Sequence, residues 1–335
     1  MKDTAIHNQI ISKKSTLPIL MNAKAEGGIM RSTNLDVQIQ TETDLADGLY
    51  RLVGGKWLPS NPELEVDDFP VAIKPDGKEI TFALDRVAAK RLIACSSEDY
   101  TRCELNGILF KVHKGGITLV STDGRRLTVC EWKASKVPES VFGDYIIPNY
   151  GNKNKHPLSM LMKDKKRDEI VMQTGKEYVS FSNGEQTITT RVVERTYPNY
   201  KRVVPEEDEG MFYVDQAVMT AALKELEPYT NDSDIIGMYL EDESIRLYGS
   251  DPSQALEHEI VVSAKHIRKP EKEVRSIALS VVYLIDSFAQ EEGVVYVGYT
   301  CELSPICIGT QFEKKHGQDR IKRNDVTVQM SMRIH

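Results

Sequence analysis

The sequence repeats itself, and this repetition constrains the fold more than any other feature of the chain. The stretch Phe82-Ala-Leu-Asp85 leads into residues 86–93, and the stretch Phe212-Tyr-Val-Asp215 leads into residues 216–224, at an offset of 130 residues. Each pattern predicts a strand followed by an amphipathic helix, because an aspartate carboxylate can cap the first free amides of a helix. The chain therefore contains at least two copies of one structural unit.

Two further pairs of segments repeat at nearly the same offset. Residues 117–124 resemble residues 245–252, and Phe69-Pro70 resembles Tyr197-Pro198, in both cases 128 residues apart. Short matches arise by chance, but three agreeing offsets indicate a true repeat. The length of 335 residues also suits two or three domains better than one.

A shorter first copy precedes these two. Thr33-Asn34 matches Thr122-Asp123 at an offset of only 89 residues, so the first copy lacks 39 of the 128 residues that separate the other copies. We therefore predict three domains: an abbreviated one over residues 1–70, a central one over residues 71–204 and a C-terminal one over residues 205–335.

Turn signals and helix patterns within each copy predict the fold class. Asn183-Gly184 and Asp123-Gly124 favour tight hairpins, because glycine adopts the positive φ that these turns need. Second helices are predicted after Ile146-Ile-Pro148 and over Val281–Ala289. Strands and helices mixed without strict alternation predict an α+β fold of mainly antiparallel sheets, with two helices in each full domain.

Composition excludes several classes of protein. With 40% hydrophobic and 28% charged residues, no apolar run long enough to cross a bilayer and no apolar core near Met1, the chain is predicted to be cytoplasmic, without a membrane partner. The five cysteines show no Cys-x-x-Cys spacing, and we expect reduced thiols. The seven histidines are scattered, so we predict no metal site and no cofactor.

The net charge limits how the chain could bind DNA. It has 43 basic and 50 acidic residues, a formal charge of −7. A protein that held DNA through its overall charge would be basic. Any DNA contact is therefore expected to use a local positive lining on an otherwise acidic body.

Five motifs, taken in their order along the chain, carry a resemblance to a known family. They are Thr16-Leu-Pro-Ile-Leu20, Leu105-Asn-Gly-Ile-Leu-Phe110, Thr122-Asp-Gly-Arg-Arg-Leu127, Tyr197-Pro-Asn-Tyr-Lys-Arg-Val-Val-Pro205 and Met330-Ser-Met-Arg-Ile334. Together they resemble the bacterial DNA polymerase III beta subunit, the replicative sliding clamp. The resemblance implies three clamp domains, the first abbreviated. It also implies a non-catalytic homodimeric ring that binds duplex DNA independently of its sequence.

The C-terminal motif shows how a plain strand can serve such a role. Residues 326–334 alternate between apolar and polar side chains, which is typical of a strand with one buried face. Val326 and Val328 are expected to cover the domain's own core. Met330 and Met332 are flexible thioethers that suit an adaptable binding surface. In the family this segment helps to line the groove that captures partner peptides; here Ser331 replaces a proline and Ile334 a leucine.

The resemblance implies a pocket for short linear peptides of the polymerase catalytic subunit and the clamp loader. Taken alone, the turn at Thr122–Leu127 is an ordinary hairpin. An extended tail would bury apolar side chains among leucine, valine and methionine, while arginines and backbone groups fix its polar groups. The pocket residues carried over are Leu105, Thr122, Gly124, Arg125, Arg126, Leu127, Pro198, Arg202, Val203, Val328, Met330, Met332 and Arg333.

The family's DNA contacts carry over less completely. Arg86 and Lys90 fall on the polar face of the helix after Asp85, where a solvated face and a phosphate contact remain alternatives. The run from Lys314 to Arg323 is expected to be a solvated loop. The predicted DNA contacts are Lys13, Lys14, Arg86, Lys90, Arg102, Lys153 and Lys155.

The shortened first domain bears on whether two chains can close into a ring. In the family, edge strands of one protomer's first domain pair with the next protomer's third domain. The missing 39 residues fall between Val37 and Phe69, where a helix and an edge strand of that contact are expected. An open edge needs a partner or protection, and two identical head-to-tail contacts must close.

Three functions follow in order of support. The first is a DNA polymerase processivity factor that performs no chemistry and tethers its partners to duplex DNA. The alternative is a clamp-like module that competes for clamp-binding peptides without encircling DNA. An enzyme is disfavoured, because the sequence has no Gly-x-x-x-x-Gly-Lys-[Ser/Thr], Gly-x-Gly-x-x-Gly or Gly-x-Ser-x-Gly motif, and we predict no catalytic residues.

Overall fold

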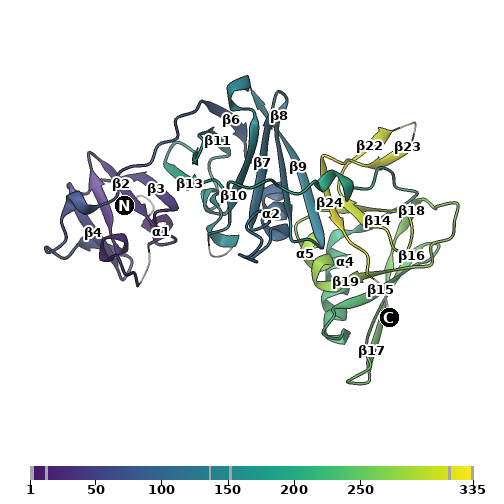
Figure 1. The fold of residues 1–335 in the computed structure, drawn as a ribbon. Helices are drawn as coiled ribbons and strands as arrows, with labels where there is room; N and C mark the ends of the chain where they lie inside the picture. The colour runs from purple at the N-terminus through teal and green to yellow at the C-terminus, as the bar shows by residue number, and fades with distance from the viewer. Residues whose placement is uncertain (1–3, 12–13, 136, 151–152, 316–317, 333–335) are drawn as a thin grey trace. The chain divides into compact units, whose positions relative to one another are not determined.

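The structure, a computed structural model, describes residues 4–11, 14–135, 137–150, 153–315 and 318–332 (Figure 1). By its internal contacts the chain forms two compact units. Unit 1 comprises Met1–Ala89, Glu98–Leu119 and Trp132–Tyr197, and unit 2 comprises Lys90–Ser97, Val120–Glu131 and Pro198–His335. This division does not test the three predicted domains. The first predicted domain and part of the central one share a sheet through the pairing of β3 with β13, so they fall in one compact unit.

The first part of unit 1 is a small antiparallel sheet. Its strands pair in the order β3–β2–β1–β4–β5. Ala23, Ala25, Met30 and Trp57 form its core. The elements are α1 (Thr4–His7), η1 (Pro18–Met21), β1 (Ala23–Glu26), β2 (Ile29–Thr33), β3 (Val37–Glu42), β4 (Gly48–Val53), β5 (Lys56–Pro59) and η2 (Val66–Asp68).

The rest of unit 1 extends this sheet. Strand β3 pairs with β13, and the sheet continues through β12 and β11 to β6, while β7 pairs antiparallel with β10. The elements are β6 (Glu79–Ala83), β7 (Gly107–His113), η3 (Glu139–Val141), β10 (Gly143–Pro148), η4 (Lys153–Lys155), α3 (Pro157–Leu161), β11 (Glu169–Gln173), β12 (Tyr178–Ser182) and β13 (Gln186–Arg191). Three elements pass from one unit into the other: α2 (Arg86–Cys95), β8 (Gly116–Thr122) and β9 (Arg126–Ser135).

Unit 2 has two antiparallel sheets, a pair of helices and a projecting hairpin, β22–β23 (Figure 1). One sheet runs β18–β14–β20–β21–β24–β9 and the other β17–β16–β15–β19. The helices α4 and α5 bury their apolar residues against a core that includes Phe212, Leu223 and Phe288.

The elements of unit 2 after Pro198 are η5 (Tyr200–Arg202), β14 (Gly210–Asp215), α4 (Gln216–Leu226), η6 (Glu227–Tyr229), β15 (Ile235–Leu240), β16 (Ser244–Asp251), β17 (Leu256–Ser263), β18 (Lys265–Arg268), β19 (Ser276–Ser280), α5 (Val281–Ala289), β20 (Val294–Tyr299), β21 (Ile306–Gly309), β22 (Phe312–Lys315), β23 (Gln318–Ile321) and β24 (Asp325–Gln329). The predicted α+β class of mainly antiparallel sheets is confirmed. The predicted helix over Val281–Ala289 has the expected bounds. Among the residues described, no helix is long and apolar enough to cross a membrane.

The repeated helix starts are confirmed at the level of single hydrogen bonds. The Ala88 amide donates to Asp85 Oδ1 over 3.0 Å, and the Val218 amide donates to Asp215 Oδ1 over 3.0 Å. Each bond satisfies one of the amides that a helix leaves free at its N-terminus. The aspartates therefore set the same helix boundary in both copies.

The repeated turns are also confirmed. The amides of Arg125 and Arg126 donate to Asp123 Oδ1, and the amides that follow Asn34 and Asn183 use those side chains in the same way. The residue after each Asn or Asp has a positive φ: +92° at Gly124, +89° at Gly184 and +79° at Leu35. The abbreviated first copy thus keeps the turn but places a leucine where the central copy has glycine.

Candidate peptide-binding site

The base of the candidate site is the antiparallel pairing of β9 with β24 in unit 2. Leu127 lies opposite Val328 and Thr128 opposite Thr327, whose hydroxyl oxygens are 3.1 Å apart. Leu127 is 3% exposed and Val328 is 1% exposed. These two predicted pocket residues therefore lie side by side as buried supports beneath the surface.

The turn before Leu127 is held by its own side chains. The Thr122 hydroxyl donates to the Arg126 carbonyl over 2.6 Å, and the Gly124 amide donates to the Thr122 hydroxyl over 3.0 Å. Gly124 and Arg125 are exposed at its tip. The predicted residues Thr122, Gly124 and Arg125 thus form a hydrogen-bonded turn, and the Arg125 side chain is exposed at its tip.

Arg126, unlike the exposed Arg125, has its side chain buried inside unit 2. Its guanidinium donates to Asp123 over 3.0 Å, to Asp286 over 2.9 Å and to the Ala94 carbonyl over 2.9 Å, and it lies 4.5 Å from the centre of the Tyr283 ring. The side chain is only 4% exposed. Arg126 therefore joins the turn to α2 and α5, and its donors are already used inside unit 2.

Sequence reasoning did not find Asp286 and Tyr283. A signal for Asp286 was present, since it is the only charged residue of Val281–Ala289. A lone carboxylate in an apolar helix needs a partner. Tyr283 has no comparable signal, because aromatic residues in such helices usually belong to the core.

The segment after β24 combines a fixed backbone with accessible thioethers. The Met330 amide donates to the Arg125 carbonyl over 3.0 Å, and the Met332 amide donates to the Ala278 carbonyl over 2.8 Å. The Gln329 side chain donates to the Ser280 carbonyl over 3.1 Å. Met330 is 37% exposed and Met332 is half-buried. Both methionine side chains can therefore contact a ligand from a segment whose backbone is anchored.

A third group of predicted residues lies before, in and after η5. Pro198 and Arg202 are exposed, and Val203 is 40% exposed. The chain just beyond is tied down, because Arg323 donates to the Pro205 carbonyl over 2.7 Å and to the Asp208 carboxylate over 2.8 Å. The segment 205–210 is thus held against the rest of unit 2.

Two predicted pocket residues are not placed with the others. Leu105 belongs to unit 1, where it is buried and its amide donates to the Arg102 carbonyl over 2.9 Å. Arg333 lies outside the described residues. The direct contacts therefore join the turn at Thr122–Leu127 to the segment Val328–Met330, and the complete pocket stays a prediction.

Arg86, one of the predicted DNA contacts, has its guanidinium inside unit 1. It donates to the Met162 carbonyl over 2.9 Å, to the Asp164 carbonyl over 2.6 Å and to the Asp168 carboxylate over 2.8 Å. These bonds hold the loop between α3 and β11. The position predicted to contact phosphate therefore organises a neighbouring loop.

The remaining predicted DNA contacts vary in exposure. Lys14 and Lys90 are exposed, while Arg102 is exposed and lies 3.2 Å from Asp99. Lys153 and Lys155, in η4, are half-buried. Lys13 lies outside the described residues. No described contact links these side chains into one surface, and their role stays a prediction.

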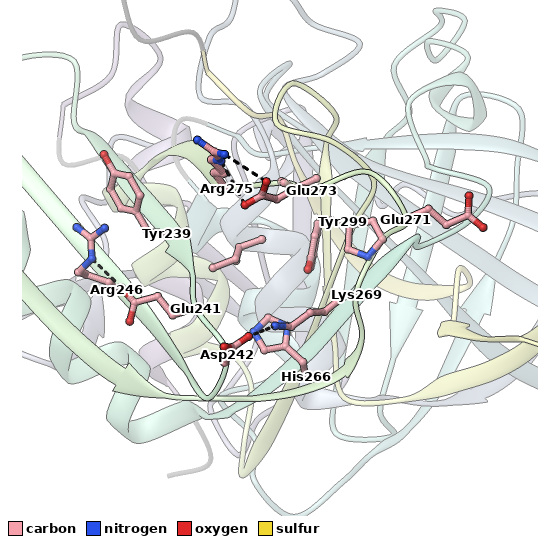
Figure 2. A pocket seen from close by; sticks show the side chains of 13 residues that line it. Tyr239, Glu241, Asp242, Arg246, His266, Lys269, Glu271, Glu273, Arg275 and Tyr299 are labelled. Atoms are coloured by element: carbon pink, nitrogen blue, oxygen red, sulfur yellow. Dashed lines mark hydrogen bonds and ion pairs between the residues drawn. The ribbon is translucent and has the colours of Figure 1, made fainter.

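Unit 2 also contains a cavity of about 600 Å³ that no sequence motif indicated (Figure 2). Its charged lining pairs within itself, as Arg246 lies 2.8 Å from Glu241 and Arg275 lies 3.2 Å from Glu273. Burial lowers the pKa of His266. The other lining residues are Tyr239, Leu240, Asp242, Lys269, Pro270, Glu271, Val274 and Tyr299. None belongs to the predicted peptide pocket, so this cavity is a separate feature.

Comparison with known proteins gives agreeing results. The family model for the DNA polymerase III beta subunit, central domain, matches residues 81–199. The beta sliding clamp of Treponema pallidum is 26% identical over 266 residues, which cover 67% of this chain and 70% of that protein. That of Caulobacter vibrioides is 27% identical over 263 residues, covering 64% of this chain and 68% of that protein. A Pseudomonas aeruginosa clamp is 26% identical over 197 residues, which span only 52% of its length.

Solved structures extend the likeness over nearly the whole chain. The sliding clamp of Bacillus subtilis has a TM-score of 0.79 at 16% identity, covering 98% of this chain and 96% of that one. The DNA polymerase III beta subunit of Pseudomonas aeruginosa has a TM-score of 0.78 at 21% identity, with 98% and 95% covered. The chain is thus similar to DNA polymerase III beta subunits, with the family model matching over residues 81–199. These matches support the predicted resemblance, and the predicted clamp fold is confirmed.

Proposed function

We propose that this chain acts as a homodimeric ring around duplex DNA and holds the polymerase catalytic subunit and the clamp loader by short peptides. It performs no chemistry itself. The observation that carries the proposal is the anchored segment Gln329–Met332, which presents two accessible thioethers beside the turn at Thr122–Leu127. The cytoplasmic location expected from the sequence belongs to this proposal, because the DNA to be encircled is there.

The peptide groove works by burial of a few apolar side chains. Met330, Met332 and Val203 are all accessible, and methionine adapts its shape to different partners. Burying a leucine and a phenylalanine is worth roughly 3–6 kcal/mol before the peptide's loss of freedom is subtracted. The resulting affinity is modest, which suits partners that must exchange on one clamp.

The test of the groove is peptide capture by methionine variants. In Met330→Ala/Met332→Ala the dissociation constant of a labelled peptide containing Leu and Phe is expected to rise about tenfold or more, measured by fluorescence anisotropy. The matched control is Met21→Ala, at a half-buried methionine of unit 1. Unchanged binding in the double variant would show that the groove lies elsewhere.

Two edge strands support the closing of a ring. Among the described strands, β17 pairs only with β16 and β5 pairs only with β4. Strand β17 exposes Glu257, Glu259 and Val261, whereas β5 exposes Lys56 and Leu58. Pairing β17 of one chain with β5 of the next would match acidic with basic and apolar with apolar side chains. The shortened first domain thus still has an edge strand, β5, that can pair with β17 of the next chain.

The ring is tested by mass and by retention on DNA. Sedimentation velocity is expected to show two chains for the wild type and one for Val261→Asp, because a buried unpaired charge opposes strand pairing. A closed ring should remain on circular DNA at a salt concentration that removes ordinary phosphate contacts and should leave linear DNA. A wild type that sediments as a monomer at micromolar concentration would overturn the ring.

The competitor module remains a second candidate because of the charge on the unit 2 helices. Helices α4 and α5 carry one basic residue, Lys224, against the acidic residues Glu225 and Asp286. Helices with so little positive charge attract phosphates weakly. Peptide capture combined with no retention on circular DNA would favour this second function.

A further inference from the structure

Positive charge is concentrated in one short segment of unit 1. Residues 153–167 contain six lysines and arginines against one aspartate, a net charge of +5. Because the whole chain carries −7, the remainder carries −12. The segment comprises η4, α3 and the loop that follows α3 up to Arg167, and the loop ends with Asp168, which pairs with Arg86. A local positive region on an acidic body is the arrangement expected of an acidic protein that binds DNA.

The loop after α3 has a fixed backbone. Nη1 of Arg86 donates to the Met162 carbonyl and Nη2 donates to the Asp164 carbonyl, while Nε donates to the Asp168 carboxylate. A second acceptor for Nη2 is the Arg167 carbonyl at 3.3 Å. One guanidinium thus holds the loop at its start, middle and end.

The carboxylate in the middle of the loop, that of Asp164, forms hydrogen bonds and an ion pair that hold the loop together. Asp164 accepts from the Lys166 amide over 2.9 Å, from Arg167 over 3.1 Å and from the Asn183 side chain over 3.1 Å. Burial alone would raise the pKa of Asp164, but these bonds and the nearby arginines keep that pKa below its ordinary value. Arg167 also pairs with Glu185 over 2.6 Å. The negative charge is therefore neutralised within the loop and its hairpin neighbour.

The lysines of the loop are left to solvent. Lys163, Lys165 and Lys166 are exposed, and none of their side-chain ammonium groups lies within 4.0 Å of a carboxylate of the described residues. A solvated loop would not need four backbone or carboxylate acceptors on one arginine. Ordering the backbone in advance lowers the entropy that is lost when the lysines bind a ligand.

We infer that the loop Lys163–Lys166 is a contact site for the phosphate backbone of duplex DNA, positioned by Arg86. The inference rests on the proposed function and extends it to residues that no sequence motif indicated. Lysine is a point charge without the planar fork of arginine, which suits contacts that must not depend on base sequence. Exposed lysines also allow contacts to break and re-form as a ring moves along DNA.

The test is the salt dependence of binding to a short duplex. Each phosphate contact contributes about 0.9 to the slope of log K against log salt, so Lys163→Gln/Lys165→Gln/Lys166→Gln is expected to lower the slope by about 2 to 3. The matched control is Lys74→Gln/Lys78→Gln/Lys176→Gln, which removes the same charge from exposed lysines of unit 1. The control is expected to keep a slope close to that of the wild type.

The outcomes separate the site from the function. Equal slopes in the two triple variants would overturn the loop site alone, provided that peptide capture and mass are unchanged. A wild type that does not bind duplex DNA would overturn both the site and the encircling function. The variant Arg86→Lys keeps the charge but loses the carbonyl bonds, and it is expected to weaken DNA binding severalfold without altering peptide capture. Full DNA affinity in Arg86→Lys would remove the positioning role.

Discussion

A buried ion network explains why the end of α2 belongs to unit 2, and it gives a sharp prediction. Arg91, on α2, lies 3.0 Å from Glu291 just after α5 and also pairs with Asp325 at the start of β24. The side chains of Arg91 and Glu291 are 4% and 1% exposed. Removing one partner of such a pair typically costs about 3–5 kcal/mol, because the other charge is left buried.

We expect Glu291→Gln to lower the free energy of unfolding by about 2–3 kcal/mol, below that range because Asp325 still faces the guanidinium. The measurement is urea unfolding. The variant and the wild type are compared with the same slope of unfolding free energy against urea concentration. The control is Glu225→Gln, whose side-chain contact with His258 is largely exposed and should contribute less than about 1 kcal/mol.

A double-mutant cycle with Arg91→Met and Glu291→Met separates attraction from desolvation. The double variant is expected to be more stable than either single variant, because it removes both fully buried charges and leaves only Asp325, whose side chain is 22% exposed, without its partner. If Glu291→Gln changes the unfolding free energy by less than about 1 kcal/mol, the charge is not buried in solution and the reasoning fails.

Three further predictions concern single sites. Leu35→Gly should stabilise the protein by about 0.5–1 kcal/mol in urea unfolding, because glycine relieves the positive φ of +79° while losing only a half-exposed side chain; a loss of stability would contradict it. Gly107→Ala should destabilise by about 2 kcal/mol or more in the same assay, since its Cβ would lie 2.3 Å from the Ile147 carbonyl oxygen; an unchanged midpoint would argue against this close approach. Burial lowers the pKa of His7 to about 4, below the unfolded value, so stability should fall as the pH drops from about 6.5 towards 4, by about 2 kcal/mol at pH 5. His7→Gln should show a correspondingly flatter dependence of unfolding free energy on pH, and an identical dependence would refute the assignment.

The repeats made much of the fold predictable. Asp85 and Asp215 cap helices because the capping bond is local, and the turn at Asp123 forms from residues within four positions of one another. Such bonds depend on residue type and spacing, which the sequence states directly. The motif order also indicated a resemblance to the family, which the comparisons support.

The roles of the arginines were not predictable in the same way. Arg86 and Arg126 were assigned to DNA and peptide, but each donates to at least three acceptors inside its own unit. The partners of Arg126 include Asp286, 160 residues away in sequence. Spacing along the chain contains no information about contacts between such distant segments. The exposed lysines at Lys163–Lys166 were overlooked because no family motif covers them.

The pairing of β9 with β24 has a consequence for how the protein is made. Thr128 and Thr327 meet across 199 residues, so the ribosome completes one strand long before it begins the other. Until then β9 presents unpaired backbone groups along this edge, which is where nascent chains aggregate or recruit chaperones. Closing so long a loop is also a late step in folding. The surface formed by β9 and β24 is therefore complete only after β24 has been synthesised and has paired with β9.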